Sequence, residues 1–149
     1  MAAPIVLAVG ISAPAETIFD AISTTTGLAS FWTTDSTAEP SVGSVARFGF
    51  GGPKLQMRVD QLDPGRRIAW TCLTEFPMTR YWEGTTVTWE LSRKENGGVN
   101  VLFQHGSWPA ELPQTELAAT AYTWALILGA LKAYAETGKA EPVFAITAR

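Results

Sequence analysis

A long helix is predicted near the end of the chain, from roughly Pro113 to Thr137. Its apolar residues recur three or four positions apart and so share one helical face: Leu117, Ala121, Trp124, Leu128, Leu131 and Ala135. Gly138 follows, and glycine commonly ends helices because it adopts positive φ at little cost. About 24 residues at 1.5 Å each make a rod of about 36 Å. A small domain must wrap its other elements around such a rod.

The residues before this helix alternate between apolar and polar with the period of two that is typical of half-buried strands. The strands predicted in this way cover residues 45–50, 55–60, 68–72, 86–91 and 99–105. Asp63-Pro64-Gly65 and Asn96-Gly97-Gly98 are turn signals between neighbouring strands. A loop is expected from Glu75 to Trp82, where Phe-Pro-Met interrupts the alternation.

The N-terminal region predicts one strand and then two short helices. The strand is Ile5 to Ile11, the first helix begins at Pro14 and runs to Thr24, and the second covers Gly27 to Trp32. We therefore expect an α+β fold in which a curved antiparallel sheet wraps around the long helix, with two short helices after the first strand. One domain should cover residues 1–149, with 139–149 as an extended tail.

Charge and composition exclude several classes of protein. The net charge is −3, and no basic cluster exceeds two residues, which argues against a nucleic-acid or anionic-membrane partner. No apolar run is long enough to span a membrane, and the first residues lack the basic start of a signal peptide. A single cysteine, Cys72, forms no intrachain disulfide and fits a reducing compartment, so we expect a cytoplasmic protein.

Aromatic residues are unusually frequent, with six Trp, seven Phe and three Tyr among 149 residues. Rings supply large apolar area with a defined shape, so a set of them can line a pocket as well as fill a core. We expect a pocket between sheet and helix, with Trp82 and Trp108 near its entrance. The predicted ligand-binding residues are Trp32, Phe50, Trp70, Trp82, Trp89, Phe103, His105, Trp108, Trp124 and Leu128.

His105 is the only histidine and the best candidate for a catalytic group. By alternation from Val101 and Phe103 it points inward, where it could act as a general acid or base, anchor a polar ligand group, or make structural hydrogen bonds. One histidine and one cysteine do not supply a usual zinc site. No glycine-rich phosphate loop and no nucleophile motif is present. We therefore expect neither a metal nor a cofactor.

The order of these elements resembles the helix-grip fold of the START and Bet v 1-like (SRPBCC) superfamily, and most closely its branch named after the activator of Hsp90 ATPase. The residues that carry the resemblance are Ile11 to Phe19, Phe31-Trp32, Asp63 to Ile68, Val101 to His105, and Tyr122 to Gly138. Each motif alone is weak, but their order is specific and covers nearly the whole chain. The resemblance implies the fold more strongly than the function.

Three functions are open. The favoured one is the binding of a small hydrophobic or aromatic molecule between the sheet and the long helix, without catalysis. The second is an enzyme similar to polyketide cyclases and aromatases of the wider superfamily, with His105 as its acid or base. The third is a protein-interaction module in a stress or chaperone pathway, which predicts an exposed patch rather than a pocket. The chain is expected to be a monomer or a homodimer.

Overall fold

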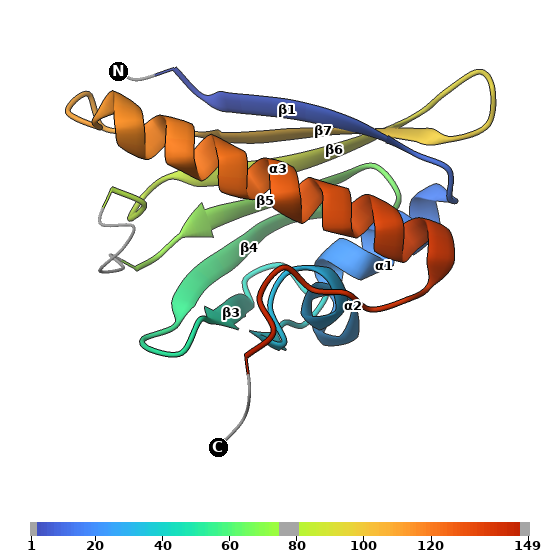
Figure 1. Ribbon diagram of the computed structural model, residues 1–149, viewed down its shortest axis with the longest axis horizontal. Coiled ribbons are helices and arrows are strands. Elements are labelled where there is room, and N and C mark those ends of the chain that lie inside the picture. Colours follow the sequence, from blue (N-terminus) through green and yellow to red (C-terminus); the bar gives the residue numbers. More distant parts are fainter. Residues whose placement is uncertain (1–2, 75–80, 147–149) are drawn as a thin grey trace.

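The protein consists of a curved sheet with one long helix across its face and two short helices at one end (Figure 1). The computed structural model describes residues 3–74 and 81–146. The elements in chain order are β1 (Ile5–Ile11), α1 (Ala15–Ser23), α2 (Thr25–Phe31), β2 (Asp35–Thr37), β3 (Val45–Gly49), β4 (Leu55–Asp63), β5 (Arg67–Cys72), β6 (Thr86–Arg93), β7 (Val99–Gly106) and α3 (Gln114–Thr137). This order confirms the predicted α+β helix-grip fold.

The seven described strands form one antiparallel sheet in the order β1-β7-β6-β5-β4-β3-β2. The first strand thus pairs with the last, and the strands on either side of the two short helices become the two edges. A register shift between Val59 and Gln61 marks a β-bulge in β4, which bends the strand and increases the curvature of the sheet. The concave face receives the apolar side chains and α3.

The predicted alternation is confirmed in the long strands. Leu55, Met57 and Val59 of β4 are buried, as are Ile68 and Trp70 of β5. Three residues are too few to show a period, which is why β2 had no predicted bounds. Residues 75–80 of the predicted loop lie outside the described residues.

The two short helices meet at a close backbone contact. The Thr24 side chain caps α2 by accepting a hydrogen bond from the Gly27 backbone N–H at 3.1 Å. The prediction therefore began this helix two residues late, since its first turn is polar. A Cβ on Gly27 would lie 2.2 Å from the carbonyl oxygen of Ala21, so only glycine lets α1 and α2 approach this closely.

Helix α3 confirms the predicted rod and its end. Gly138 has φ 76°, and its N–H donates to the carbonyl of Tyr134 at 2.7 Å. The fully buried residues of α3 are Trp124, Ile127, Leu128 and Leu131, so the buried stripe is narrower than predicted and includes an isoleucine that the prediction left out. Within the described part of the chain, no helix is long and apolar enough to cross a membrane.

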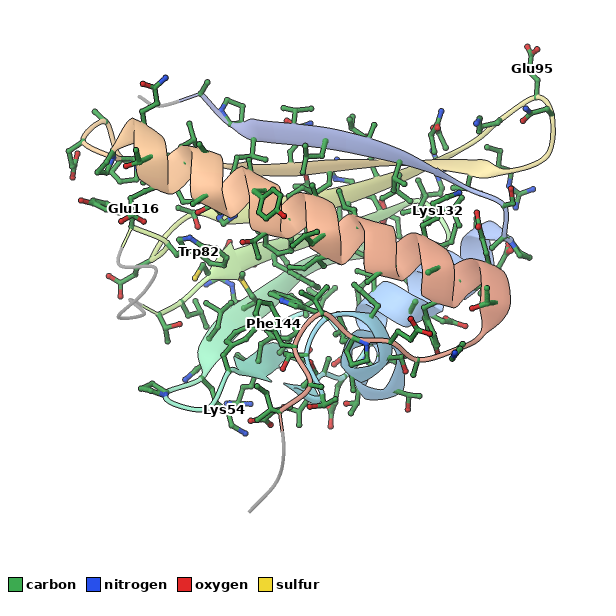
Figure 2. The ribbon with its side chains drawn as sticks, in the orientation of Figure 1. Lys54, Trp82, Glu95, Glu116, Lys132 and Phe144 are labelled. Atoms are coloured by element: carbon green, nitrogen blue, oxygen red, sulfur yellow. The ribbon has the colours of Figure 1, made fainter. Side chains whose placement is uncertain are left out.

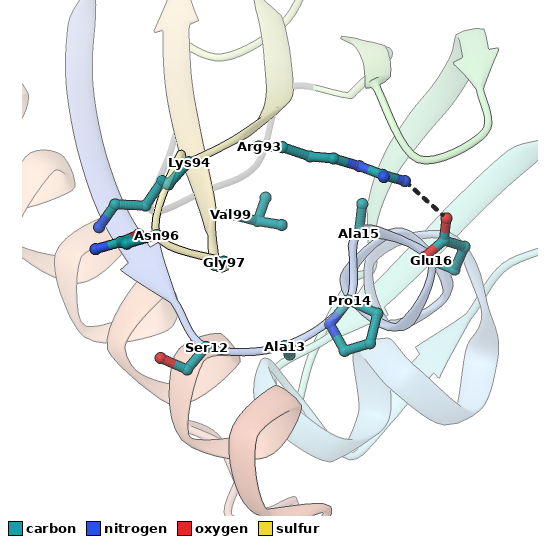
Figure 3. Close-up of a pocket in the computed structure, with 11 residues that line it drawn as sticks. Ser12, Ala13, Pro14, Ala15, Glu16, Arg93, Lys94, Asn96, Gly97 and Val99 are labelled. Carbon is teal, nitrogen blue, oxygen red and sulfur yellow. Dashed lines mark hydrogen bonds and ion pairs between the residues drawn. The ribbon is translucent and has the colours of Figure 1, made fainter.

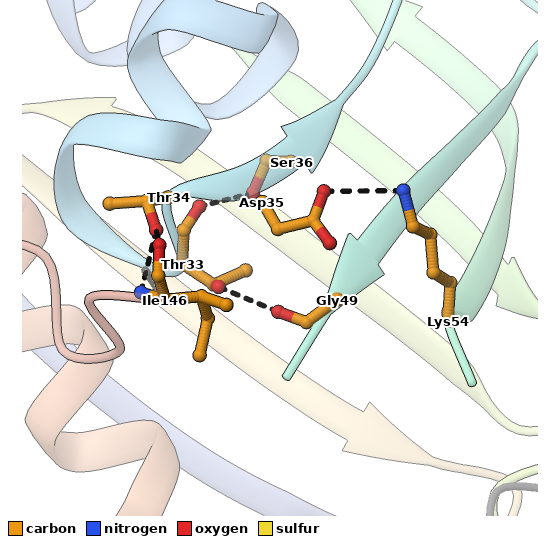
Figure 4. A network of polar contacts seen from close by, with 7 residues as sticks. All are labelled: Thr33, Thr34, Asp35, Ser36, Gly49, Lys54 and Ile146. Carbon is orange, nitrogen blue, oxygen red and sulfur yellow. Dashed lines mark hydrogen bonds and ion pairs between the residues drawn. The ribbon is translucent and has the colours of Figure 1, made fainter. Parts of the chain in front are cut away.

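After α3 the chain returns in an extended path beside the start of β2. Phe144 donates its N–H to the Trp32 carbonyl at 2.8 Å and accepts from Thr34 N–H at 3.0 Å. Ile146 exchanges two further hydrogen bonds with the Thr34 hydroxyl, within the polar network of Figure 4. The tail is therefore held in place up to residue 146. That residues 1–149 form a single domain stays a prediction.

Candidate functional site

Six buried rings fill the space between the sheet and the middle of α3. This aromatic cluster consists of Trp32, Phe48, Trp70, Trp89, Phe103 and Trp124. Neighbouring ring centroids lie between 4.2 Å, for Trp32 and Phe48, and 6.3 Å, for Trp32 and Trp70. Such spacings are those of stacked and edge-to-face contacts. The cluster is therefore a packed core, and it closes the space directly beneath the centre of the helix.

The open space lies instead at one side of α3, in a cleft of about 360 Å³. We call this the side cleft. Its lining residues are Trp32, Phe50, Leu55, Trp82, Glu116, Ala119, Thr120, Thr123, Trp124, Ile127 and Phe144. Ligand sites commonly have volumes of about 300–1,000 Å³, so the cleft has room for one small molecule.

Five parts of the chain form the walls of the side cleft: the end of α2, the β3–β4 region, the segment at Trp82, α3 and the tail. One flank of α3 supplies the wall that carries Glu116 and Trp124, and Figure 2 shows Trp82 and Phe144 on the same side of this helix. The Trp82 ring stacks on Trp124 at 6.0 Å. The Phe144 ring meets Phe50 edge-on at 5.1 Å. The extended tail is thus a wall of the cleft, because its hydrogen bonds to residues 32 and 34 hold Phe144 over the sheet.

The side cleft offers mainly apolar contact with a few polar groups on its α3 wall. Of the described residues that line it, five are aromatic, and Glu116 is the only charged one. The Thr123 hydroxyl donates to the Ala119 carbonyl at 3.2 Å and so has its proton occupied within the helix. The arrangement suits a flat apolar molecule whose polar end reaches toward the N-terminal turn of α3.

His105 lies outside this cleft, in a fully bonded network beneath α3. Its side chain is 0% exposed. The Trp124 indole N–H donates to Nδ1 at 3.1 Å, and Nε2 lies 2.8 Å from the Thr85 hydroxyl. That hydroxyl in turn donates to the Trp82 carbonyl. The Trp108 indole donates to the backbone carbonyl of His105 at 2.8 Å and covers its ring at 4.1 Å.

These donors fix the protonation of the ring. An indole N–H only donates, so Nδ1 must be the unprotonated nitrogen and Nε2 must carry the proton. Burial lowers the pKa of His105 from 6.5 to about 3, because desolvation opposes the charged form. The imidazole is therefore neutral near pH 7, with both nitrogens occupied by protein partners. This geometry gives His105 a role in holding β7, α3 and the Trp82 segment together.

The ten predicted ligand-binding residues fall into two groups. Trp32, Phe50, Trp82 and Trp124 line the side cleft. The others lie beside it in the packed interior and do not border it: Trp70, Trp89, Phe103, His105, Trp108 and Leu128. Trp108 was expected near the entrance, but it is 1% exposed because its indole turns back onto the His105 carbonyl.

The prediction missed the remaining residues of the cleft wall. Ala119, Thr120 and Thr123 lie on the flank of α3 rather than on its apolar stripe, so periodicity does not single them out. Phe144 had a detectable signal, since it lies in the apolar run from Val143 to Ile146 within the tail.

Other reactive groups in the described residues do not form a second site. Burial raises the pKa of the Cys72 thiol, so it stays protonated. No three His, Cys, Asp or Glu side chains of residues 3–74 and 81–146 gather closely enough to hold a metal ion. A hollow of about 520 Å³ between the start of α1 and the β6–β7 turn is crossed by the exposed Arg93–Glu16 ion pair at 3.3 Å (Figure 3). Arg93 and Glu16 are thus solvated and already paired with each other.

The buried indole N–H of Trp89 has no hydrogen-bond partner in the described part of the chain. Its ring meets Trp70 and Trp124 edge-on, at 5.5 Å and 6.0 Å. Trp89 does not border the side cleft, so this donor belongs to the packed core.

Comparison with known proteins gives a family and a consistent fold. The family described as Activator of Hsp90 ATPase homolog 1-like protein matches residues 12–136. Among proteins with curated descriptions, none matches the chain.

Among solved structures, the Aha1 dimer from Colwellia psychrerythraea is 32% identical with a TM-score of 0.81, covering 93% of this chain and 99% of that one. The protein SSP2350 from Staphylococcus saprophyticus is 19% identical with a TM-score of 0.75, covering 93% and 96%. DynU16, a protein of the dynemicin biosynthetic locus, is 24% identical with a TM-score of 0.75, and the match spans 94% of this chain but 49% of DynU16. The last two likenesses show the fold alone.

Proposed function

The chain belongs to the Activator of Hsp90 ATPase homolog 1-like family of the SRPBCC superfamily, and on this premise we propose that it binds a small apolar or aromatic molecule in the side cleft. The observation that carries the proposal is the cleft itself, about 360 Å³ with five aromatic rings around it. Those rings supply stacking and apolar area. Glu116 and Thr120 would orient a polar end of the ligand.

Binding without catalysis fits the site better than the cyclase-like alternative. That alternative relies on His105 as an acid or base, and its ring is neutral, fully bonded and outside the cleft. A general base needs a free nitrogen within hydrogen-bond reach of its substrate. Among the described residues that line the cleft, Glu116 is the one titratable group, and it lies at an exposed position. It serves better as a polar contact than as a catalytic acid.

We further propose that the chain acts as a homodimer in the cytoplasm. The 32% identical relative from Colwellia psychrerythraea is described as a dimer, which supports self-association here. The single cysteine, Cys72, is a buried free thiol, which supports a reducing compartment such as the cytoplasm. The interaction-module alternative would need an exposed patch rather than the cleft.

The proposal is tested by titrating the protein with prodan, a neutral aromatic dye whose emission shifts on leaving water. Ala119 lines the cleft, so Ala119→Trp places an indole into the ligand volume. We expect this change to weaken prodan binding by at least about tenfold, a loss of about 1.4 kcal/mol or more.

The matched control is Ala140→Trp, which adds the same ring at an exposed position outside the cleft. This variant should bind prodan as the unchanged protein does. Equal affinity in all three proteins would show that the dye binds elsewhere, and absence of binding in the unchanged protein would remove the support for a ligand site.

A further inference from the structure

The outward face of α3 is apolar along most of its length. The exposed residues on this face, which we call the outer stripe, are Ala118, Tyr122, Ala125, Leu126, Gly129 and Ala133. Tyr122 is 68% exposed and Leu126 46% exposed, two of the four large apolar side chains most exposed in the described residues. Figure 1 shows α3 in front of the sheet, and none of the described elements covers this side.

The outer stripe is also uncharged. No charged residue occurs between Glu116 and Lys132, although 25 of the 149 residues are charged, 11 Lys or Arg and 14 Asp or Glu. Lys132 is itself neutralised by Glu136 at 2.6 Å. Two copies that each carry a net charge of −3 would repel least along such a strip.

Gly129 has no explanation within a single copy of the chain. Glycine weakens a helix interior relative to alanine, and a Cβ at this position would meet nothing within 4 Å. Nothing in the described structure therefore requires a glycine at this position. A small residue does have a use where a second helix crosses, because it lets the two axes approach.

The outer stripe is complementary to itself in an antiparallel pair. A two-fold axis between residues 125 and 126 sets Tyr122 of each copy against Gly129 of the other, and Ala118 against Ala133. The largest side chain of the stripe thus meets the smallest residue, twice. Antiparallel packing also sets the positive end of each helix dipole beside the negative end of the other.

We propose that the outer stripe of α3 is the interface through which two copies of this chain associate, in an antiparallel, two-fold arrangement. This inference rests on the homodimer proposed above and adds the surface that forms it. The competing surface is the sheet edge at β1, where Val6 is 52% exposed and a second β1 could pair. The edge offers this one exposed large apolar side chain, whereas the stripe offers two together with their matching small residues.

Sedimentation equilibrium or light scattering of the full chain tests the proposal. The unchanged protein should show a mass near twice 16.1 kDa. The double variant Tyr122→Lys, Leu126→Lys should show the single mass, with unchanged circular dichroism, because both side chains are exposed. Gly129→Leu is an independent second variant, since it adds bulk only where the second copy would lie. Val42→Lys, which changes a valine 64% exposed elsewhere, should stay dimeric.

A cross-link tests the axis. Ala125→Cys should form a disulfide-linked dimer under mild oxidation, because the two copies of residue 125 lie beside the axis, whereas Ala140→Cys should not. The native thiol of Cys72 is buried and does not compete. A dimer that survives both stripe variants, or that Val6→Lys dissociates, would overturn the proposed interface while leaving the homodimer. A monomeric unchanged protein that still binds prodan would overturn self-association and leave the ligand proposal intact.

Discussion

Acidification should destabilise this protein through one identifiable group. The folded state holds the pKa of His105 near 3 by burial, against 6.5 for an ordinary histidine. Between these values the unfolded chain binds a proton that the folded chain does not. The free energy of unfolding is therefore at its full value above pH 6.5, and it decreases as the pH falls toward 3 because the unfolded chain gains the proton.

The size of the effect follows from the two pKa values. Protonation of His105 in the unfolded chain lowers the free energy of unfolding by about 2 kcal/mol at pH 5 and by about 3 kcal/mol at pH 4. The whole difference between the two pKa values corresponds to about 5 kcal/mol. A domain of this size is stable by about 5–15 kcal/mol. The loss of stability at pH 5 should thus lower the urea midpoint measurably while the protein stays folded.

Nuclear magnetic resonance gives the cleanest assay, because His105 is the only histidine and its Cε1 proton is a single resonance. That resonance should stay at its neutral position from pH 8 to pH 5. In parallel, urea unfolding of the unchanged protein should lose about 2 kcal/mol more between pH 7 and pH 5 than the His105→Gln variant, in which the carboxylate contributions remain. A titration midpoint near 6.5 would refute the bonded, desolvated ring.

Three further changes test individual contacts. Thr85→Val removes the partner of the His105 Nε2 proton and leaves a buried donor unpaired, which should cost about 1–3 kcal/mol in urea unfolding; an unchanged midpoint would contradict the buried Thr85–His105 hydrogen bond. Gly138→Ala forces a Cβ into the left-handed region at φ 76° and should cost about 1–2 kcal/mol in thermal unfolding, whereas a stabilised variant would contradict the observed helix end. Phe144→Ala removes a wall of the side cleft and should weaken prodan binding several-fold, with unfolding made easier by about 1–3 kcal/mol; undiminished affinity would place the ligand away from the tail.

Local pattern was sufficient to predict the elements and much of the core. The alternation in β4 and the stripe on α3 follow from periods of two and 3.6 residues, so the long strands and the rod could be derived, although β2 and Ile127 were missed. The capping of α2 by Thr24 was available too, but glycine at position 27 looked like a start rather than a packing contact.

The location of the cleft could not be derived in this way. Whether Trp70 and Trp89 line a cavity or fill it depends on how rings from different strands pack, which no single segment encodes. The same holds for Phe144, which becomes a wall only because residues 32 and 34 hydrogen-bond the tail. His105 was correctly placed inward, yet its partners Thr85 and Trp124 come from other elements, and they determine what its nitrogens can do.

The most direct test of the account is the position of a bound molecule. Nuclear Overhauser effects from prodan should reach the methyl groups of Ala119 and Ile127 and the ring of Phe144, all of which line the side cleft. The methyl of Ala140, outside the cleft, should show none. Contacts confined to other surfaces, or their persistence in Ala119→Trp, would contradict the assignment of the side cleft as the ligand site.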